Sequence, residues 1–389
     1  MPVLSCGGMR YQFKWGDVKP EDIPAENQRN LEDTIRRAVE LGINHIETAR
    51  GYGSSEQQLG HVLPKLPRDK IIVQTKIGPC DAASFLKTFE TSMANLKLDY
   101  VDLLAIHGIN TQELCDSSVK PGGCLEAARK LQKQGRCRWV GFSTHGPTDV
   151  IVNTIRAPGS DGRGFDYINL HWYYIFQRNW PAIEEATRRD MGVFIISPSD
   201  KGGKLYEPPQ KLVDLCRPLH PIVFNDLFCL SHPQVHTLSI GAARPTDFDR
   251  HMEVLPLLDK AAEVLPPIQH RLETAMEQAV GSRDPESIMK HLPAPDNAPG
   301  GVNFPLILWL RNLALGWGMT EYGKMRYNML GSGGHWFPGL NVEKLAGVSR
   351  EDMKKAVAAS PHAEKIEGWL HEAHAMLGGE SVKRLSESK

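Results

Sequence analysis

Eight short apolar runs recur before residue 245, and this repetition constrains the fold more than any other feature of the chain. Several are almost continuously apolar, as expected for strands that are covered on both faces. Helical patterns separate them: in residues 27–41 one face is apolar and Gly42 supplies a stop, the residues of that face being Leu31, Ile35, Ala38 and Val39. Regular strand–helix alternation predicts parallel β/α architecture, and eight units favour a closed barrel over an open sheet. The runs are residues 3–9, 43–47, 71–77, 101–107, 138–143, 166–171, 192–197 and 236–241.

The two ends of the chain need separate interpretation. The first run contains Cys-Gly-Gly, which would also suit a hairpin at the bottom of the barrel. A different texture begins near residue 259: a predicted helix is followed by a stretch rich in Pro and Gly at 281–303, and a last charged helical segment spans 350–377. The 389 residues exceed a single barrel of roughly 250. We predict an α/β fold, a (β/α)8 TIM barrel over 1–258, with a mostly helical C-terminal extension over 259–389.

Composition narrows the functional class. Lys and Arg total 45 against 46 Asp and Glu, so no basic surplus points to nucleic acid. The most apolar segment, 304–315, is too short for a bilayer span of about 20 residues, and no secretory pattern is evident near the N-terminus. Seven cysteines, an odd number at irregular spacing, indicate reduced thiols. We therefore expect a cytoplasmic protein without membrane or nucleic-acid partners, either a monomer or a homodimer.

Four ionisable residues stand at or just beyond the ends of three of these runs. Glu47 ends the second run, Lys76 lies near the end of the third, His107 ends the fourth, and Tyr52 follows Glu47 closely. Parallel barrels build their active sites at the C-terminal ends of their strands. We therefore expect these four side chains to meet at one mouth of the barrel.

An acid, a phenol, an amine and an imidazole suit proton transfer to a carbonyl oxygen. Carbonyl reduction needs a proton at the oxygen as negative charge builds there, but a phenol with an unperturbed pKa of about 10 is a poor acid. A neighbouring ammonium lowers that pKa, so Lys76 would activate Tyr52 while Glu47 holds and partly neutralises Lys76. His107 would donate a hydrogen bond to the substrate oxygen and stabilise its developing charge.

The pieces GINHIETARGYGSSEQQLG, VQTKIG, DLLAIHG, GFSTHGP and SIGAARPTDF together resemble the aldo-keto reductases, in order and spacing, from about residue 3 to 251. The resemblance implies a (β/α)8 barrel that binds NADPH, or less often NADH, in extended form. By position, Tyr52 matches the family's proton donor, Lys76 its pKa-lowering lysine and His107 its carbonyl-orienting histidine. Glu47 stands where most members carry Asp, a change that adds one methylene to the lysine's partner.

The same resemblance implies a set of cofactor contacts. Ser143 and Thr144 match the Ser-Asn pair that holds the nicotinamide amide, with Thr in place of Asn, and Asn169 falls where a Gln often does the same work. Ile196 stands where many members stack a Tyr on the nicotinamide ring. Arg244 would meet an adenosine 2′-phosphate, since guanidinium suits phosphate geometry, or it is a solvated loop arginine. The pyrophosphate loop would supply Ser197, Ser199 and Lys201, and the 2′-phosphate segment Gly241, Ala242 and Arg244.

The C-terminal part resembles the ferredoxin-like extension of one aldo-keto reductase branch. Members of that branch usually carry a run of cluster-binding cysteines before a G-[IV]-N-x-P segment, where this chain has SIMKHLPAPDNAP. No cysteine follows Cys229, so thiolate ligands are lacking there. We predict a helical scaffold without an iron–sulfur cluster, and no metal site.

Two functions are compatible with these features. The first is an NADPH-dependent reductase of small aldehydes or ketones, with aromatic candidates for the substrate pocket at Trp15, Trp172, Tyr173 and Trp336. The second is a regulatory or sensor barrel that binds a nicotinamide dinucleotide with little or no turnover and uses the extension as a docking surface for a partner. The changes at Glu47 and Ile196 and the lack of cluster cysteines in the extension suggest this alternative. A barrel hydrolase or lyase would need paired carboxylates or a metal cluster at the strand ends, and the sequence offers neither.

Overall fold

The structure is a computed structural model that describes residues 1–332 and 336–382. The chain forms two compact units, one made of residues 1–202 and 225–261 and the other of residues 203–224 and 262–382. Each unit has its own interior, and the four candidate catalytic residues all belong to the first.

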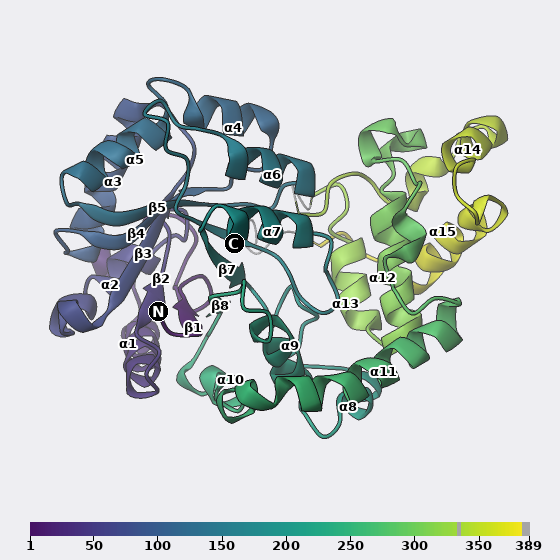
Figure 1. The fold of residues 1–389 in the computed structure, drawn as a ribbon, viewed down its shortest axis with the longest axis horizontal. Helices are drawn as coiled ribbons and strands as arrows, with labels where there is room; N and C mark the ends of the chain where they lie inside the picture. Colours follow the sequence, from purple (N-terminus) through teal and green to yellow (C-terminus); the bar gives the residue numbers. More distant parts are fainter. Residues whose placement is uncertain (333–335, 383–389) are drawn as a thin grey trace. The chain divides into compact units, whose positions relative to one another are not determined.

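The first unit is a closed barrel of parallel strands in chain order, which confirms the predicted fold class (Figure 1). The first run is a true barrel strand, because β1 pairs in parallel with both β2 and β8, and a hairpin at the bottom is excluded. The strands are β1 (Leu4–Gly7), β2 (His45–Glu47), β3 (Ile72–Ile77), β4 (Val101–His107), β5 (Cys137–Ser143), β6 (Tyr167–Leu170), β7 (Gly192–Ile196) and β8 (Thr237–Ile240).

Helices follow the strands around the outside of the barrel (Figure 1). In α1 the predicted stripe residues Leu31, Ile35 and Ala38 are buried, whereas Val39 is half-buried. The next long helix, α3, begins where the Asp81 side chain accepts a hydrogen bond from the Ser84 N–H at 3.0 Å. In chain order the helices of the barrel unit are α1 (Ala25–Glu40), α2 (Ser55–Leu59), α3 (Ala82–Leu96), α4 (Gln112–Val119), α5 (Cys124–Lys133), α6 (Thr148–Arg156), α7 (Trp180–Arg188), most of α9 (Pro221–Leu230) and α10 (Asp249–Met252), whereas α8 (Gln210–Cys216) belongs to the second unit.

Side chains fill the inside of the barrel. The rings of Tyr167 and Phe194 stack with centroids 5.0 Å apart, and Leu103 and Ala105 belong to the same buried cluster. Gly141 makes room for this layer, because a Cβ at that position would lie 2.6 Å from the Tyr167 ring. The barrel is therefore a packed core, and its chemistry must take place at its ends.

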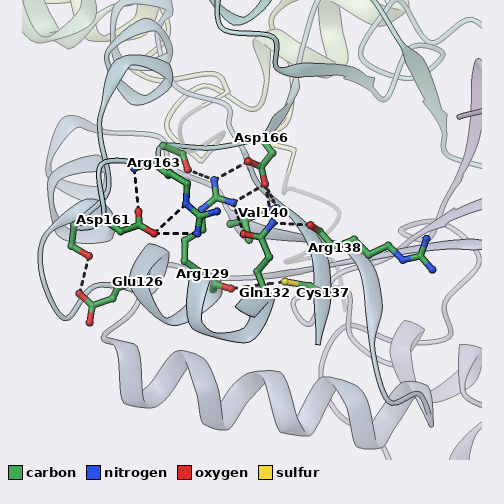
Figure 2. Close-up of polar contacts among 12 residues, drawn as sticks. Glu126, Arg129, Gln132, Cys137, Arg138, Val140, Asp161, Arg163 and Asp166 are labelled. Atoms are coloured by element: carbon green, nitrogen blue, oxygen red, sulfur yellow. Dashed lines mark hydrogen bonds and ion pairs between the residues drawn. The ribbon is translucent and has the colours of Figure 1, made fainter. Parts of the chain in front are cut away.

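Paired charges secure the end of the barrel where the strands begin. Asp166, just before β6, accepts hydrogen bonds from Arg129 of α5 at 2.7 and 2.9 Å and from the backbone N–H of Val140 at 2.8 Å (Figure 2). Asp102 in β4 is 5% exposed and pairs with Arg68 at 2.8 Å. These charged groups neutralise one another at the end of the barrel opposite the C-terminal ends of the strands. We therefore assign them a role in stability and not in catalysis.

The second unit is helical. Its centre is α12, which is capped at its start by Asn303 and packs against α13 and α15. The segment predicted as one helix at 350–377 is two, because Pro361 has no N–H for a helical hydrogen bond and breaks it just before α15. The helices are α11 (Ala261–Val280), α12 (Phe304–Trp317), α13 (Thr320–Tyr327), α14 (Arg350–Val357) and α15 (Ala363–Leu377). The irregular stretch 281–303 holds three single 3₁₀ turns, Ser287–Met289, Pro295–Asn297 and Pro299–Gly301.

Within the described residues, every helix is too short or too polar to serve as a membrane span. The same residues hold no group of three or more His, Cys, Asp or Glu side chains placed to bind a metal ion. All seven cysteines are free thiols, and Cys80 alone among them is more than slightly exposed.

Candidate active site

The barrel topology brings three of the four predicted residues to the same end. Glu47 is the last residue of β2, Lys76 the penultimate residue of β3 and His107 the last of β4. Tyr52 lies in the loop after β2, where its N–H donates to the Ala49 carbonyl at 2.9 Å. The structure therefore assembles the four side chains as a group, although they are spread over 61 positions of sequence from 47 to 107.

A glycine fixes the Tyr52 loop. Gly53 has φ +54°, a left-handed conformation that favours glycine, and a Cβ there would lie 1.9 Å from the Lys14 carbonyl oxygen. The N–H of Ser54 donates to that same oxygen at 3.0 Å. The chain around Lys14 thus contacts the turn that carries Tyr52. It also places Trp15 edge-on to Tyr52, with ring centroids 6.4 Å apart.

Lys76 is the centre of the group. Its Nζ donates to Glu47 Oε1 at 2.6 Å, to the Thr48 carbonyl at 3.0 Å and to the Tyr52 hydroxyl oxygen at 3.4 Å. Burial alone would lower the pKa of Lys76, but the Glu47 charge and these hydrogen bonds outweigh burial and raise it. Lys76 is therefore an ammonium whose three hydrogens all have acceptors.

The pKa of the Tyr52 phenol differs from what the sequence led us to expect. Lys76 does lower its pKa, as expected, but burial acts in the opposite direction and is larger, so the pKa of Tyr52 is raised overall. Burial excludes the water that would solvate a phenolate, and one nearby ammonium shared with Glu47 does not replace it. Tyr52 is held as a protonated phenol, which is the form that a proton donor requires.

His107 completes the group beside Tyr52. The two rings are nearly perpendicular, with centroids 5.4 Å apart. Burial, followed by the charges of Lys76 and Lys201, lowers the pKa of His107 to about 3. The imidazole is therefore neutral near pH 7 and has one N–H with which to orient a polar oxygen.

Glu47 has spare capacity. Its carboxylate is 3% exposed, and Oε2 has no hydrogen-bond partner among the described residues. One Glu47 oxygen thus holds Lys76, and the other has no donor. The Glu47 charge also acts on the Cys6 thiol, whose pKa is raised first by burial and then by that charge. The longer carboxylate keeps the ion pair short, so the change from the family's usual Asp preserves this contact.

The predicted amide-binding residues lie next in register. Parallel pairing places His107 beside Ser143 and Ser143 beside Asn169. Asn169 Oδ1 accepts a hydrogen bond from the Gln74 amide at 2.9 Å, whereas its Nδ2 is buried without a partner in the described chain. Thr144 Oγ1 donates to the Ile109 carbonyl at 2.7 Å and so holds its own loop. Asn169 consequently presents two unused donor hydrogens close to His107 and Ser143.

The loop after β7 carries the predicted diphosphate residues. Ser197 has φ +56°, and Gly202 closes so tightly that a Cβ there would lie 1.9 Å from the Pro198 carbonyl oxygen. Ser199 Oγ lies 3.1 Å from His251 Nε2. Ile196 ends β7 and offers an aliphatic side chain where a Tyr was noted as usual.

Lys201 belongs to a cluster that sequence reasoning missed. Its Nζ lies 3.3 Å from His171 Nε2 and 3.5 Å from His145 Nδ1, and the two imidazoles stack with centroids 4.7 Å apart. His171 Nδ1 lies 2.6 Å from the Tyr173 hydroxyl, which itself donates to the Ile196 carbonyl, so Nδ1 of His171 carries the hydrogen. His145 directly follows Thr144, and His171 lies two residues after Asn169. This closeness in sequence to two predicted cofactor residues was the signal that could have identified the two histidines.

In the segment after β8, the chain itself contacts two of the three predicted cofactor residues, and the third is buried. The Gly241 carbonyl accepts a hydrogen bond from Arg10 at 3.2 Å, and Ala242 is buried. Arg244 is 73% exposed and pairs with Asp247 at 3.1 Å. Of the four pocket candidates, Trp15 lies against Tyr52, whereas Trp172 and Tyr173 are 2% and 0% exposed and pack in the barrel unit; Trp336 belongs to the second unit.

Comparison with known proteins shows which family the first part of the barrel resembles. Residues 3–157 match the family model described as Aldo/keto reductase family. This part of the chain belongs to the aldo/keto reductase family. Curated relatives include the L-galactose dehydrogenase of Arabidopsis thaliana, 37% identical over 136 residues, and the NADH-specific methylglyoxal reductase of Escherichia coli, 33% identical over 201 residues. These matches cover 32% and 44% of this chain and 41% and 56% of the relatives, so the chain spans about half of their length or less.

Solved structures support the same barrel. An aldo-keto reductase from Bacillus halodurans in its holo form superposes with a TM-score of 0.57 at 21% identity, over 69% of this chain and 91% of that one. An aldo-keto reductase from Klebsiella pneumoniae in complex with NADPH gives 0.52 at 18% identity, over 68% and 92%. At such identities the likeness shows the shared fold.

Proposed function

We propose that the chain is an oxidoreductase that reduces a small aldehyde or ketone to an alcohol with NADPH, and that Tyr52 donates the proton. The observation that carries this proposal is the position of Lys76, whose buried ammonium contacts both the buried Glu47 carboxylate and the hydroxyl of the half-buried Tyr52. The ring of His107 lies edge-on to the same phenol.

The residues present fit a nicotinamide cofactor. The buried Nδ2 of Asn169 has two hydrogens without an acceptor in the described chain, as an amide carbonyl would require. Ser197, Ser199 and Lys201 lie in one tight loop with a positive φ, a suitable surround for a diphosphate. Reduced nicotinamide, when bound, would supply the hydride that the carbonyl carbon receives.

The chain's own side chains would handle the oxygen. A neutral His107 donates a hydrogen bond to the carbonyl oxygen and fixes its direction. As charge builds on that oxygen, the Tyr52 proton moves to it, and Lys76 at 3.4 Å stabilises the phenolate that remains. Glu47 keeps Lys76 in place during the transfer, since their atoms are 2.6 Å apart in a nearly water-free site.

Arg244 is the basis for preferring NADPH to NADH. Its guanidinium is exposed and pairs with Asp247 at the surface, so a 2′-phosphate could displace that exposed contact. Binding of both cofactors to the wild type and to Arg244→Gln would test the preference. A loss confined to NADPH supports the assignment, and equal affinity for the two cofactors in the wild type removes it.

The experiment that tests the function is steady-state consumption of NADPH and of NADH with a panel of aldehydes and ketones. We expect turnover that falls about 10²- to 10⁴-fold in Tyr52→Phe, with cofactor affinity retained. Tyr100→Phe is the matched control, because Tyr100 precedes β4 at the opposite end of the barrel and contacts Arg68. Tight cofactor binding without turnover on any carbonyl would instead support the sensor function that the changes at Glu47 and Ile196 motivate.

A further inference from the structure

Three polar side chains form a hydrogen-bonded chain across the inside of the barrel. His45 comes from β2, Gln74 from β3 and Asn169 from β6, and each is fully buried. His45 Nε2 lies 3.1 Å from Gln74 Oε1, and Gln74 Nε2 donates to Asn169 Oδ1 at 2.9 Å. His45 and Gln74 stand two residues before Glu47 and Lys76, so they share the inward face of their strands with the catalytic pair, one step deeper.

The amide oxygens fix the direction of the hydrogens in this chain. An amide oxygen only accepts, so the hydrogen between His45 and Gln74 is on Nε2 of the imidazole. His45 is neutral near pH 7, because burial lowers its pKa to about 4, and a neutral imidazole carries a single ring hydrogen. Its Nδ1 therefore has a lone pair, and this atom has no partner among the described residues.

The opposite direction would require the other tautomer of His45. Asn169 Nδ2 would then donate to Gln74, Gln74 would donate to a bare His45 Nε2, and the ring hydrogen would lie on Nδ1. That hydrogen would be buried with no acceptor in the described chain, and a buried N–H without an acceptor is rarer in proteins than a buried acceptor without a donor. The tautomer of His45 and the direction of the Asn169 amide are therefore linked.

The free end of the chain lies beside the proposed catalytic group. Parallel pairing puts Asn169 next to Ser143, and Ser143 next to His107. Asn169 Nδ2 keeps two hydrogens for which the described residues offer no acceptor. A nicotinamide carboxamide has an acceptor, its carbonyl oxygen, and a donor, its amide nitrogen. The direction of the chain decides which of the two Asn169 can bind.

We propose that His45 is a positioning residue that, through Gln74, holds Asn169 as a hydrogen-bond donor toward the carboxamide oxygen of a nicotinamide cofactor. The inference rests on the proposed function, because it assumes a nicotinamide at Asn169. His45 itself acts only through the two amide side chains.

Packing alone does not require a histidine at this position. The His45 ring lies edge-on to Phe194, with centroids 5.8 Å apart, and an aromatic hydrocarbon ring would fill the same space. Burying an imidazole costs free energy unless its nitrogens are used. The nitrogen that is used is the one that faces Gln74, so the contact that justifies the histidine is the one that sets the direction of the chain.

Nitrogen NMR of the full chain, isotopically labelled at histidine, tests the direction without any cofactor. The two ring nitrogens of a neutral histidine have different chemical shifts according to which one carries the hydrogen. The signals that disappear in His45→Gln belong to His45. We expect the hydrogen on Nε2 near pH 7, before and after NADP⁺ binds. A hydrogen on Nδ1 overturns the inference.

Two dinucleotide analogues of opposite polarity test the consequence at Asn169. In one an acetyl group replaces the carboxamide and only accepts; in the other an amino group replaces it and donates. Fluorescence titration gives a Kd for each, and their ratio is the readout, because a general loss of structure weakens both alike. We expect the wild type to prefer the acetyl analogue by at least about fivefold, since a donor left unpaired in a buried site is costly. Equal binding, or preference for the amino analogue, overturns the inference.

Two variants separate the direction of the chain from packing. The amide of His45→Gln can face Gln74 with its oxygen or its nitrogen, so the preference for the acetyl analogue should largely disappear. Leu103 pairs in register with Gln74 and belongs to the apolar layer, so Leu103→Ala loosens the same interior without removing a hydrogen bond of the chain. Its ratio should match the wild type. A ratio unchanged in His45→Gln, or an equal fall in Leu103→Ala, overturns the inference.

The outcomes separate this inference from the proposed function. If NADPH binds and supports carbonyl reduction but the two analogues bind alike, the reductase proposal stands and the inference fails alone. If neither NADPH nor NADH binds, both fail. If His45→Gln does not fold, the preference of the wild type between the two analogues still decides.

Discussion

Replacing the Lys76–Glu47 pair one member at a time should damage the barrel far more than replacing both. The side chains are 1% and 4% exposed, and Nζ and Oε1 are 2.6 Å apart. At an effective dielectric constant near 20, two unit charges at that distance attract by about 6 kcal/mol before any desolvation cost. Most of that attraction offsets the cost of burying the two charges, so the net value of the pair is small.

Removing one partner leaves the other as a buried charge. Lys76→Met leaves both Glu47 oxygens without a hydrogen-bond donor among the described residues, since Oε2 already lacks one. Glu47→Met leaves the ammonium with the Thr48 carbonyl and the Tyr52 oxygen alone. We expect each single variant to lose about 3–5 kcal/mol of unfolding free energy, and the double variant to lie within about 2 kcal/mol of the wild type.

Urea unfolding at pH 7.5, followed by circular dichroism, measures all four members of this double-mutant cycle. Lys133→Met, at an exposed lysine of α5, is the control and should change the free energy by less than about 0.5 kcal/mol. If the double variant is as unstable as the sum of the two single variants, the charges are not coupled, and the description of Lys76 as held by Glu47 is wrong.

Three further outcomes follow from individual contacts. Burial lowers the pKa of His45 to about 4 from 6.5, so between these pH values the unfolded chain binds a proton that the folded chain does not bind. The free energy of unfolding should therefore fall by up to about 3 kcal/mol as pH drops from about 6.5 to 4. Urea titrations at several pH values should show a smaller loss for His45→Gln. Asp102→Asn, which weakens the pair with Arg68, should cost about 2 kcal/mol of stability and leave cofactor affinity unchanged by fluorescence titration. Gly53→Ala should lower kcat at least tenfold, because its Cβ would lie 1.9 Å from the Lys14 carbonyl oxygen and must shift the Tyr52 turn; an unchanged kcat would contradict that geometry.

The strand positions were predictable because the physics is local. An apolar run covered on both faces has few alternatives to a buried parallel strand, and β4 begins and ends where its sequence pattern does. Once eight such strands close in chain order, their C-terminal ends share one rim, so the meeting of Glu47, Lys76 and His107 follows from topology.

Burial was not predictable in the same way. The sequence shows that a lysine can approach Tyr52, but whether water also reaches the phenol depends on how the Lys14 and Trp15 segment folds over it. That segment lies more than thirty positions away in sequence. The direction of the Tyr52 pKa, raised by burial against the effect of Lys76, therefore emerges from the folded chain alone.

The missed clusters have a related cause. Asp226 stands within the apolar run PIVFNDLFCL, and a carboxylate buried there requires a partner. That requirement was readable, but the identity of the partner was not, because His251 reaches it from a different helix. A polar residue in an apolar helix predicts that a contact exists without predicting with what.

The roles of Lys76 and Tyr52 in the site differ because groups at the end of β2 hold the lysine in place independently of the tyrosine. Lys76 is held by Glu47 and by the Thr48 carbonyl, both at the end of β2, and Tyr52 is its most distant acceptor at 3.4 Å. The ammonium is thus positioned without help from the phenol, and the carboxylate cancels its charge in the ground state. Because Tyr52 contributes its hydroxyl to a site that is already assembled, losing that hydroxyl should remove proton donation with little loss of stability. Losing Lys76 should remove proton donation and also lower the stability of the barrel. This contrast between loss of the Tyr52 hydroxyl and loss of Lys76 distinguishes a preorganised proton donor from a tyrosine that merely packs there.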